Sequence, residues 1–165
     1  MSAMTFVWLS VLLVCVQANC KWQFGNSCYQ LLTETMTFDK ALQACSAMGG
    51  GLVVPNSKNE NQFIWEEIAS NLMTDGRVWI GCIDKDKQGK WMYAADAGKR
   101  CKFDGWSPGE PNVPIILAEE CAQMWGFHSG KWVDIQCREL ASVICEYYSS
   151  LDVTCRQADA DGRFA

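Results

Sequence analysis

Two stretches of the chain carry oxygen-bearing side chains of the kind that bind a hard cation. Glu110 and Asn112 flank Pro111, Glu119 follows a few residues later, and Asp134 comes further along the chain. Calcium takes six to eight oxygen ligands from carboxylates, amides and carbonyls, and separate loops can supply them. These residues form a candidate calcium site. The competing interpretation is that they are exposed acidic residues bound only by water.

A second acidic stretch begins like an EF-hand loop but does not finish as one. Asp84, Asp86 and Gly89 match the first, third and sixth positions of such a loop. The twelfth position is Ala95, where an EF-hand needs a glutamate that binds calcium through both oxygens. We therefore exclude an EF-hand.

Zinc binding and catalysis find little support in the residues. Zinc sites built on close cysteine pairs need C-x2-4-C spacing, and no cysteine pair after residue 18 has it. His128 is the only histidine, and no G-x-S-x-G motif accompanies it, so we interpret it as a surface turn residue. Nothing locates a carboxylate pair for glycoside hydrolysis. The chain is predicted not to be an enzyme.

The composition fits one acidic domain rich in disulfides. The chain has 165 residues, 49% of them hydrophobic, and a formal net charge of -5. This length suffices for a hydrophobic core, and the lack of a Lys or Arg cluster disfavours nucleic acid as a partner. Ten cysteines indicate an oxidising compartment, where disulfides persist.

The amino terminus has the features of a secretory signal peptide. Residues 5–16 are apolar, and Ala18 supplies a small residue before the cleavage point. A membrane anchor needs about 20 apolar residues, and polar residues arrive too soon for one. We predict that residues 1–18 are removed and that the protein is secreted without a membrane anchor. Cleavage would also remove Cys15 and leave an odd number of cysteines.

Hydrophobic periodicity predicts two helices followed by several strands, which is an α+β order. Between the strands, residues 94–120 show no period, and an irregular loop of that length inside a compact domain is usually functional. Helices are expected over 37–49 and 57–72, and strands over 51–54, 78–82, 90–93, 121–125, 131–133 and 141–147.

The combined motifs resemble those of the C-type lectin domain family. The similarity extends from about Phe24 to Tyr147, and its specificity comes from the whole set of motifs. The matching elements are residues 25–29, the predicted helix that bears Cys45, residues 51–53, 79–81, 106–112, 120–121 and 131–132, Asp134, and residues 143–146.

The resemblance implies a C-type lectin fold over residues 19–148, followed by a polar tail over residues 149–165. In this fold two helices flank a small antiparallel sheet, and disulfides support a long binding loop. By the same resemblance, Cys45 pairs with Cys145 and Cys121 pairs with Cys137.

The other cysteines are less constrained by the resemblance. Cys20 and Cys28 resemble an optional amino-terminal pair of the family, and Cys82 can pair with Cys101 if a strand and a returning loop lie side by side. Cys155 is left over. It is a candidate for a disulfide between two chains, giving a homodimer, and the alternative is a rearranged pairing with Cys20.

The resemblance also implies a function. Glu110, Asn112, Glu119 and Asp134 would bind one calcium ion and the sugar together, with Pro111 in the cis form. Two neighbouring sugar hydroxyls would replace water on the ion, and Glu-Pro-Asn resembles the mannose-type arrangement. The implied protein is a secreted, calcium-dependent lectin that binds glycans in innate recognition.

One position departs from the family pattern. Val133 stands where the family's Trp-Asn-Asp motif has an asparagine, which removes a calcium ligand and a sugar hydrogen bond of about 1 kcal/mol or more. We therefore expect weaker binding. The alternative function is a domain that has lost sugar binding and recognises a protein, mineral or ice surface. A second, structural calcium site is predicted to be empty, because Gln88 and Val113 stand where the family has carboxylates.

Overall fold

The chain forms two compact units, of which residues Cys20–Tyr148 are one. The other consists of the chain ends, where β1 (Leu13–Cys15) pairs antiparallel with β11 (Cys155–Gln157) and places Cys15 opposite Cys155. The structure is a computed structural model, and it describes residues 13–15, 20–72, 76–85, 89–112, 119–148 and 155–157.

The first sheet of the larger unit joins its two ends. β2 (Trp22–Phe24) and β3 (Ser27–Leu31) form a hairpin, β10 (Ile144–Tyr148) pairs with β3, and β4 (Gly51–Leu52) pairs with β10. All these pairings are antiparallel. Because β3 and β10 come from opposite ends of the unit, their pairing closes the domain.

The second sheet includes the two strands that flank the Glu110–Asn112 loop in the chain, β7 and β8. Its strand order is β7-β6-β5-β8-β9, and each neighbouring pair is antiparallel. The predicted antiparallel sheet is therefore present as two sheets, and one strand of the second, β7, falls in the stretch predicted to be irregular. The strands are β5 (Val78–Ile83), β6 (Met92–Tyr93), β7 (Asp96–Arg100), β8 (Glu119–Trp125) and β9 (Lys131–Gln136).

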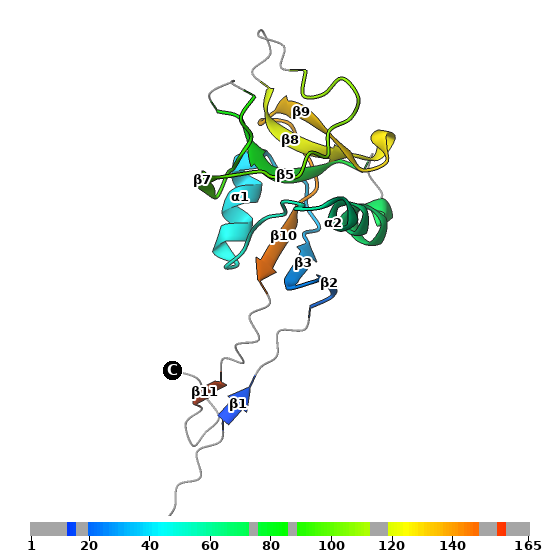
Figure 1. Ribbon diagram of the computed structural model, residues 1–165. Helices are drawn as coiled ribbons and strands as arrows, with labels where there is room; N and C mark the ends of the chain where they lie inside the picture. Colours follow the sequence, from blue (N-terminus) through cyan, green and yellow to red (C-terminus); the bar gives the residue numbers. More distant parts are fainter. Residues whose placement is uncertain are drawn as a thin grey trace, which may run out of the picture. The chain divides into compact units, whose positions relative to one another are not determined.

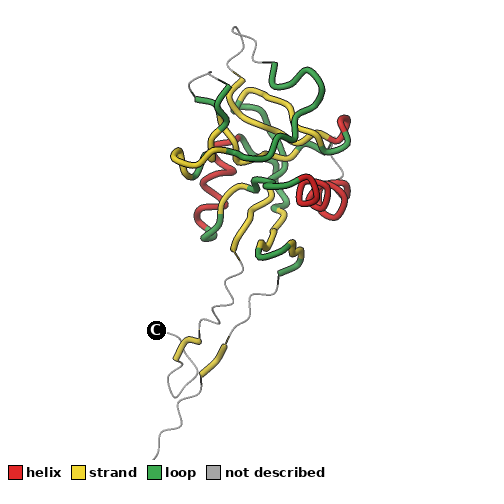
Figure 2. Tube along the Cα trace, in the orientation of Figure 1, coloured by secondary structure: helices red, strands yellow, loops and turns green. Residues whose placement is uncertain are grey.

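Both predicted helices are present, on opposite sides of the larger unit (Figures 1 and 2). The first is α1 (Phe38–Ala47). The second begins as α2 (Lys58–Phe63), where the Ser57 hydroxyl accepts a hydrogen bond from the Glu60 N–H at 3.2 Å. It then continues as a π-helical segment, η1 (Ile64–Ile68), and a 3-10 turn, η2 (Ala69–Asn71).

The two sheets approach each other closely at Gly81. A Cβ atom there would lie 2.9 Å from the carbonyl oxygen of Leu52, and the Gly81 N–H donates to the carbonyl of Val53 at 2.9 Å. Trp79 lies in the adjoining core, fully buried and in edge contact with Phe38 at 5.4 Å between ring centroids. A side chain at residue 81 would force the sheets apart, so glycine is required by the packing.

A buried carboxylate fixes the start of α2. Glu60 is 6% exposed and accepts hydrogen bonds from the Tyr29 hydroxyl at 2.6 Å and the Asn56 N–H at 2.8 Å. The burial of Tyr29 and its bond to Glu60 raise the pKa of its phenol well above the ordinary value. Buried polar groups are tolerated when hydrogen bonds satisfy them, and this group links α2 to the first sheet.

The disulfides within residues 20–148 follow the expected framework. Cys45 bonds Cys145 and Cys121 bonds Cys137, as the family resemblance implies. In the loop-entropy model, closing loops of these lengths, with sequence separations of 100 and 16, contributes roughly 4 to 5 and about 3 kcal/mol. The other described pairs are Cys20–Cys28 and Cys82–Cys101.

The alternative pairing of Cys155 with Cys20 is wrong, because Cys20 is bonded to Cys28. In the β1–β11 pair, Cys155 lies opposite Cys15. If residues 1–18 are removed as predicted, Cys155 loses that cross-strand neighbour.

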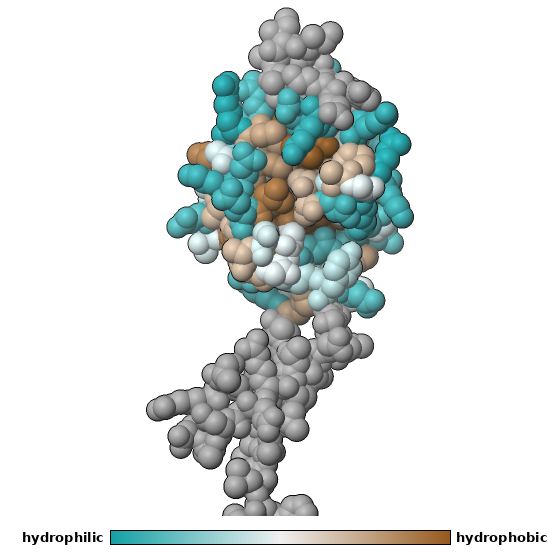
Figure 3. Space-filling view, turned by 90° about the vertical axis from the view of Figure 1, so that its left-hand side faces the viewer, coloured by the Kyte–Doolittle hydropathy of each residue, from teal (hydrophilic) through white to brown (hydrophobic). Residues whose placement is uncertain are grey.

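The surface of the larger unit mixes polar and apolar residues. On the face seen from the side of α1 and β7, apolar side chains gather at the centre and polar side chains surround them (Figure 3). Folded domains commonly leave part of their apolar surface exposed. No helix among the described residues is long and apolar enough to cross a membrane.

We expect the processed protein to migrate as a dimer on a gel without reductant and as a monomer with reductant, because Cys155 then lacks a partner within its own chain. Cys155→Ser should abolish the dimer. The mass of the secreted chain should show an amino terminus after Ala18. A reductant-sensitive dimer that survives Cys155→Ser, or a monomer that retains Cys15, would contradict this assignment.

Candidate functional site

The loop that carries Glu110 and Asn112 is docked along β9. The Trp132 N–H donates to the carbonyl of Gly105 at 2.8 Å, and the Ser107 N–H donates to the carbonyl of Trp132 at 2.9 Å. These two bonds make a parallel bridge between Trp106 and Trp132. The loop therefore runs alongside β9, the strand that also carries Asp134.

Aromatic packing supports the same contact. Trp132 packs edge-on against Trp106 and Phe103, each at 5.6 Å between ring centroids. A Cβ at Gly105 would lie 2.7 Å from the Trp132 indole, so this close approach needs glycine. The Trp132 indole N–H donates to the side-chain oxygen of Asn61 at 2.7 Å, which connects β9 to α2.

A turn then presents the Glu-Pro-Asn segment. The Glu110 N–H donates to the carbonyl of Ser107 at 3.0 Å, and Gly109 adopts a left-handed backbone with φ of 89°. The peptide bond between Glu110 and Pro111 is cis, as the resemblance predicts.

Three of the four predicted ligands meet beyond this turn. The Asn112 N–H donates to Asp134 Oδ1 at 2.9 Å and also approaches Glu110 Oε2 at 3.2 Å. The Asn112 side-chain amide donates to the same Glu110 oxygen at 2.9 Å. Asp134 is 4% exposed and Glu110 is partly exposed. Two carboxylates and one amide thus converge at the edge of the domain.

The electrostatics of this group favour a cation. Partial burial raises the pKa of Glu110 to about 7, and the hydrogen bond and negative charge of Asp134 add to the shift, while the bonds from Asn112 oppose it. Two carboxylates in contact resist simultaneous ionisation unless a positive charge lies near them. Their oxygen atoms are the ligands that calcium prefers, so these residues fit that ion.

The fourth predicted ligand is Glu119, of which only the backbone is described. The backbone of Glu119 begins β8 opposite Gln136, but its side chain is not among the described ones. Among the described residues, no group of three or more His, Cys, Asp or Glu side chains could hold a metal ion. The role of Glu119 therefore stays a prediction.

From the strand register we infer that Val133 points away from the converging carboxylates. It precedes Asp134 within β9, and neighbouring residues of a strand point to opposite faces. Val133 is 4% exposed and lies opposite Gln123, a fully buried residue whose side-chain nitrogen has no hydrogen-bond partner. The strand pairing thus puts residue 133 next to Gln123, whose side-chain oxygen accepts from the Trp125 indole N–H.

The acidic stretch that resembles an EF-hand has a structural role. Asp84 is 2% exposed, and its Oδ2 accepts a hydrogen bond from the Gly89 N–H at 2.7 Å. The predicted empty second calcium site depends on Gln88 and Val113, which lie outside the described residues. His128 is exposed in the turn Gly126–His128, as expected.

Sequence reasoning missed the residues that hold the loop in place. Asn61 accepts from Trp132 and also donates from its side chain to the carbonyl of Gly130 at 3.0 Å, across some 70 residues of sequence. Nothing near Asn61 in the sequence marks it, since it is one of several polar residues in a helix. Its part in the site depends wholly on tertiary contacts.

The fold and the converging loop residues define a C-type lectin-like domain. The sequence matches the family described as Lectin C-type domain over residues 34–147, and the chain belongs to this family. Its members are generally binding proteins without enzymatic activity. Human tetranectin is 29% identical over 121 residues, which cover 73% of this chain and 59% of tetranectin, so the chain spans well under two thirds of that relative.

Solved structures share the fold. The carbohydrate-recognition domain of the mouse scavenger receptor C-type lectin has a TM-score of 0.66 and 27% identity, covering 78% of this chain and 94% of that one. A calcium-independent type II antifreeze protein has a TM-score of 0.67 and 27% identity, covering 82% and 96%. The fold thus serves both a sugar-recognition domain and a protein described as independent of calcium.

The contact between the Glu110 and Asp134 carboxylates predicts how the melting temperature of Glu110→Gln depends on pH. Because folding raises the pKa of Glu110, the folded state favours the protonated acid, and stability is lost as the pH rises from about 4.5 through about 7. Without divalent ions, Glu110→Gln should melt at a higher temperature than the unaltered protein at pH 8 and at the same temperature at pH 4. In saturating calcium at pH 8 the order should reverse. Equal destabilisation at both pH values without calcium would contradict this account.

The position of Val133 predicts that Val133→Asn will not create a calcium ligand. Its affinity for calcium, measured by calorimetry, should stay within about threefold of the unaltered protein. Its loss of stability should be smaller than that of Val143→Asn, because an asparagine at residue 133 can accept from Gln123, whereas Val143 is fully buried in an apolar cluster. A tenfold gain in calcium affinity would show that residue 133 reaches the ion after all.

Proposed function

We propose that this protein is a secreted lectin that binds glycans through one calcium ion held by Glu110, Asn112, Glu119 and Asp134. The observation that carries the proposal is the convergence of Glu110 and Asn112, on a loop that the domain holds in place, with Asp134 of β9, whose carboxylate contacts that of Glu110. The four disulfides of the described domain are consistent with an extracellular location.

Each residue has a distinct part in this mechanism. Calcium, when bound, supplies the positive charge that attracts sugar hydroxyls. Glu110 and Asp134 supply carboxylate oxygens, and the Asn112 amide offers an oxygen to the ion and N–H donors to a hydroxyl. Carboxylates that hold the ion can also accept hydrogen bonds from the hydroxyls. The Asn112 backbone bond to Asp134 fixes the spacing of these groups before any ligand arrives.

The sugar specificity is a finer proposal. Glu110-Pro111-Asn112 resembles the mannose-type sequence, and the carbohydrate-recognition domain of the mouse scavenger receptor lectin supports sugar as the general class of ligand. We propose a mannose-type glycan bound through two neighbouring equatorial hydroxyls. A shallow site of this kind gains useful strength from several copies, to which a Cys155-linked dimer would contribute.

The alternative function is a domain that keeps the fold without calcium, as the antifreeze protein's description indicates for that relative. Val133 in place of asparagine favours this alternative at the level of sequence. Its burial on the other face of β9 weakens the argument, because the remaining ligands still converge.

Calorimetric titration separates the two functions. The unaltered protein should bind calcium at millimolar or lower concentration and then bind mannose, and Asn112→Ala should weaken calcium binding at least tenfold. Asn59→Ala, at an exposed position of α2, is the matched control and should bind as the unaltered protein does. No heat with calcium at millimolar concentration would exclude the lectin function, and calcium binding without mannose binding would exclude the proposed sugar class.

A further inference from the structure

We propose that the domain has a second binding site, separate from the calcium loop, for the sulfate groups of an extracellular sulfated glycan. The site is a strip of three exposed cations, Lys90, Arg100 and Lys102, on the outer face of the β6–β7 hairpin. This cationic strip lies at the edge of the second sheet, where β7 is the outermost strand (Figure 1).

The register of the hairpin brings the three cations together. The Cys101 N–H donates to the carbonyl of Trp91 at 3.0 Å, which continues the antiparallel pairing of β6 with β7. One more step in this register sets Lys90 opposite Lys102, with Cβ atoms about 5 Å apart. Arg100 is two residues before Lys102 on the same side of the strand, or about 7 Å away. Charges that are distant in the sequence thus share one small surface.

The alternation of the strands turns these side chains outward. Trp91 is 6% exposed, and Cys101 is bonded to the fully buried Cys82, so the residues between the cations face the core. Neighbouring residues of a strand point to opposite faces. Lys90 and Lys102 are accordingly exposed.

The local charge contrasts with that of the whole chain. Residues 89–103 contain four cations and one carboxylate, that of Asp96, whereas the chain has a formal net charge of -5. The fourth cation, Lys99, is half-buried and lies over the Tyr93 ring at 4.1 Å, so it does not belong to the strip. A positive surface on an acidic protein is suited to a local anionic group.

Two of the three cations have no partner within the domain. In the part of the chain that the structure describes, the side chains of Arg100 and Lys102 make no hydrogen bond or ion pair. Like charges directly opposite each other on neighbouring strands destabilise the pairing. An anion placed between Lys90 and Lys102 would therefore relieve a repulsion as well as bind Arg100.

The number of charges and the proposed secretion select the kind of anion. Anionic membranes attract clusters of four to eight Lys or Arg, and their anionic lipids face the cytoplasm. Domains that bind nucleic acid are strongly basic as a whole, whereas this chain is acidic. A sulfate ester presents oxygens to the planar fork of arginine as a phosphate does. Outside the cell, sulfated glycans carry such groups at intervals along a chain.

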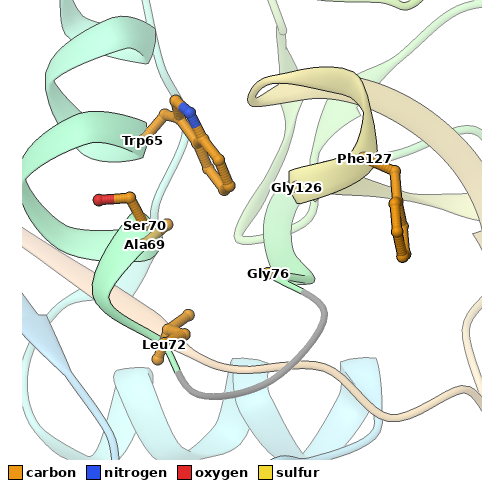
Figure 4. Close-up of a pocket in the computed structure, with 7 residues that line it drawn as sticks. All are labelled: Trp65, Ala69, Ser70, Leu72, Gly76, Gly126 and Phe127. Carbon is orange, nitrogen blue, oxygen red and sulfur yellow. The ribbon is translucent and has the colours of Figure 1, made fainter.

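The hollow at the end of the second helical segment does not compete for an anion. Trp65, Leu72 and Phe127 are among the residues that line it (Figure 4). None of its described lining residues carries a cationic side chain. A sulfated glycan is therefore expected at the cationic strip.

The test titrates the full-length secreted protein with a heparin hexasaccharide by calorimetry, in a chelator that keeps calcium out of the loop. We expect saturable binding that weakens as salt is added, because the cations release counterions to the solvent. The same hexasaccharide with its sulfates removed, which keeps the carboxylates, should bind at least tenfold more weakly.

Variants decide whether the strip is the site. The double variant Arg100→Gln with Lys102→Gln should weaken binding at least tenfold and lower the slope of log affinity against log salt by about 1.5. Lys131→Gln, an exposed lysine on β9 at the opposite edge of the same sheet, is the matched control and should bind within twofold of the unaltered protein. Both variants should keep the calcium affinity and the melting temperature, because the changed side chains are exposed.

Three results would overturn the proposal. One is the absence of heat with the hexasaccharide in chelator at low salt. Another is equal or tighter binding of the desulfated hexasaccharide or of hexathymidylate, which would assign the surface to carboxylates or phosphates. The third is full binding by the folded double variant; new self-association of that variant would then show that the cations only protect the edge strand from pairing. The titrations with calcium and mannose are independent of these results, so the two proposals can fail separately.

Discussion

The candidate site depends on one residue more than on any other, Trp132. Its backbone N–H donates to Gly105 and its carbonyl accepts from Ser107. Its ring packs against the aromatic residues of that loop, and its indole N–H donates to Asn61 of α2. Asp134 follows two residues later on the same face of β9. The contacts that fix Trp132 therefore also fix the Glu110–Asn112 loop and the Asp134 carboxylate that this loop contacts.

This arrangement explains how an acidic loop can be ordered by the protein alone. Two carboxylates in contact repel each other, and an isolated loop would relieve the repulsion by moving apart. Here the loop is fixed on β9 by backbone bonds, and the Asn112 N–H bridges Glu110 and Asp134. Packing elsewhere in the domain thus holds the two carboxylates in contact before any ligand is bound.

The sequence predicted the parts of the fold that local chemistry marks. Apolar periodicity located both helices, and the motif around Glu110 located the loop, with the family disulfides following from the resemblance. It missed β7, because Asp96–Arg100 has no apolar alternation and is paired through an irregular register with β6. The role of Asn61 was equally hidden, since it arises only where segments about 70 residues apart in the chain meet.

Val133 shows why a motif in linear sequence differs from a site in space. A motif counts positions, whereas a strand divides consecutive positions between two faces, so the change from asparagine to valine falls beside Gln123 while Asp134 keeps its contact with the loop. A domain that recognised a protein or ice surface without an ion would still have to hold Glu110 against Asp134, which keeps the pKa of Glu110 raised and lowers stability once that group ionises. The contact of these carboxylates is therefore an unfavourable feature in the calcium-free alternative and a functional one in the lectin.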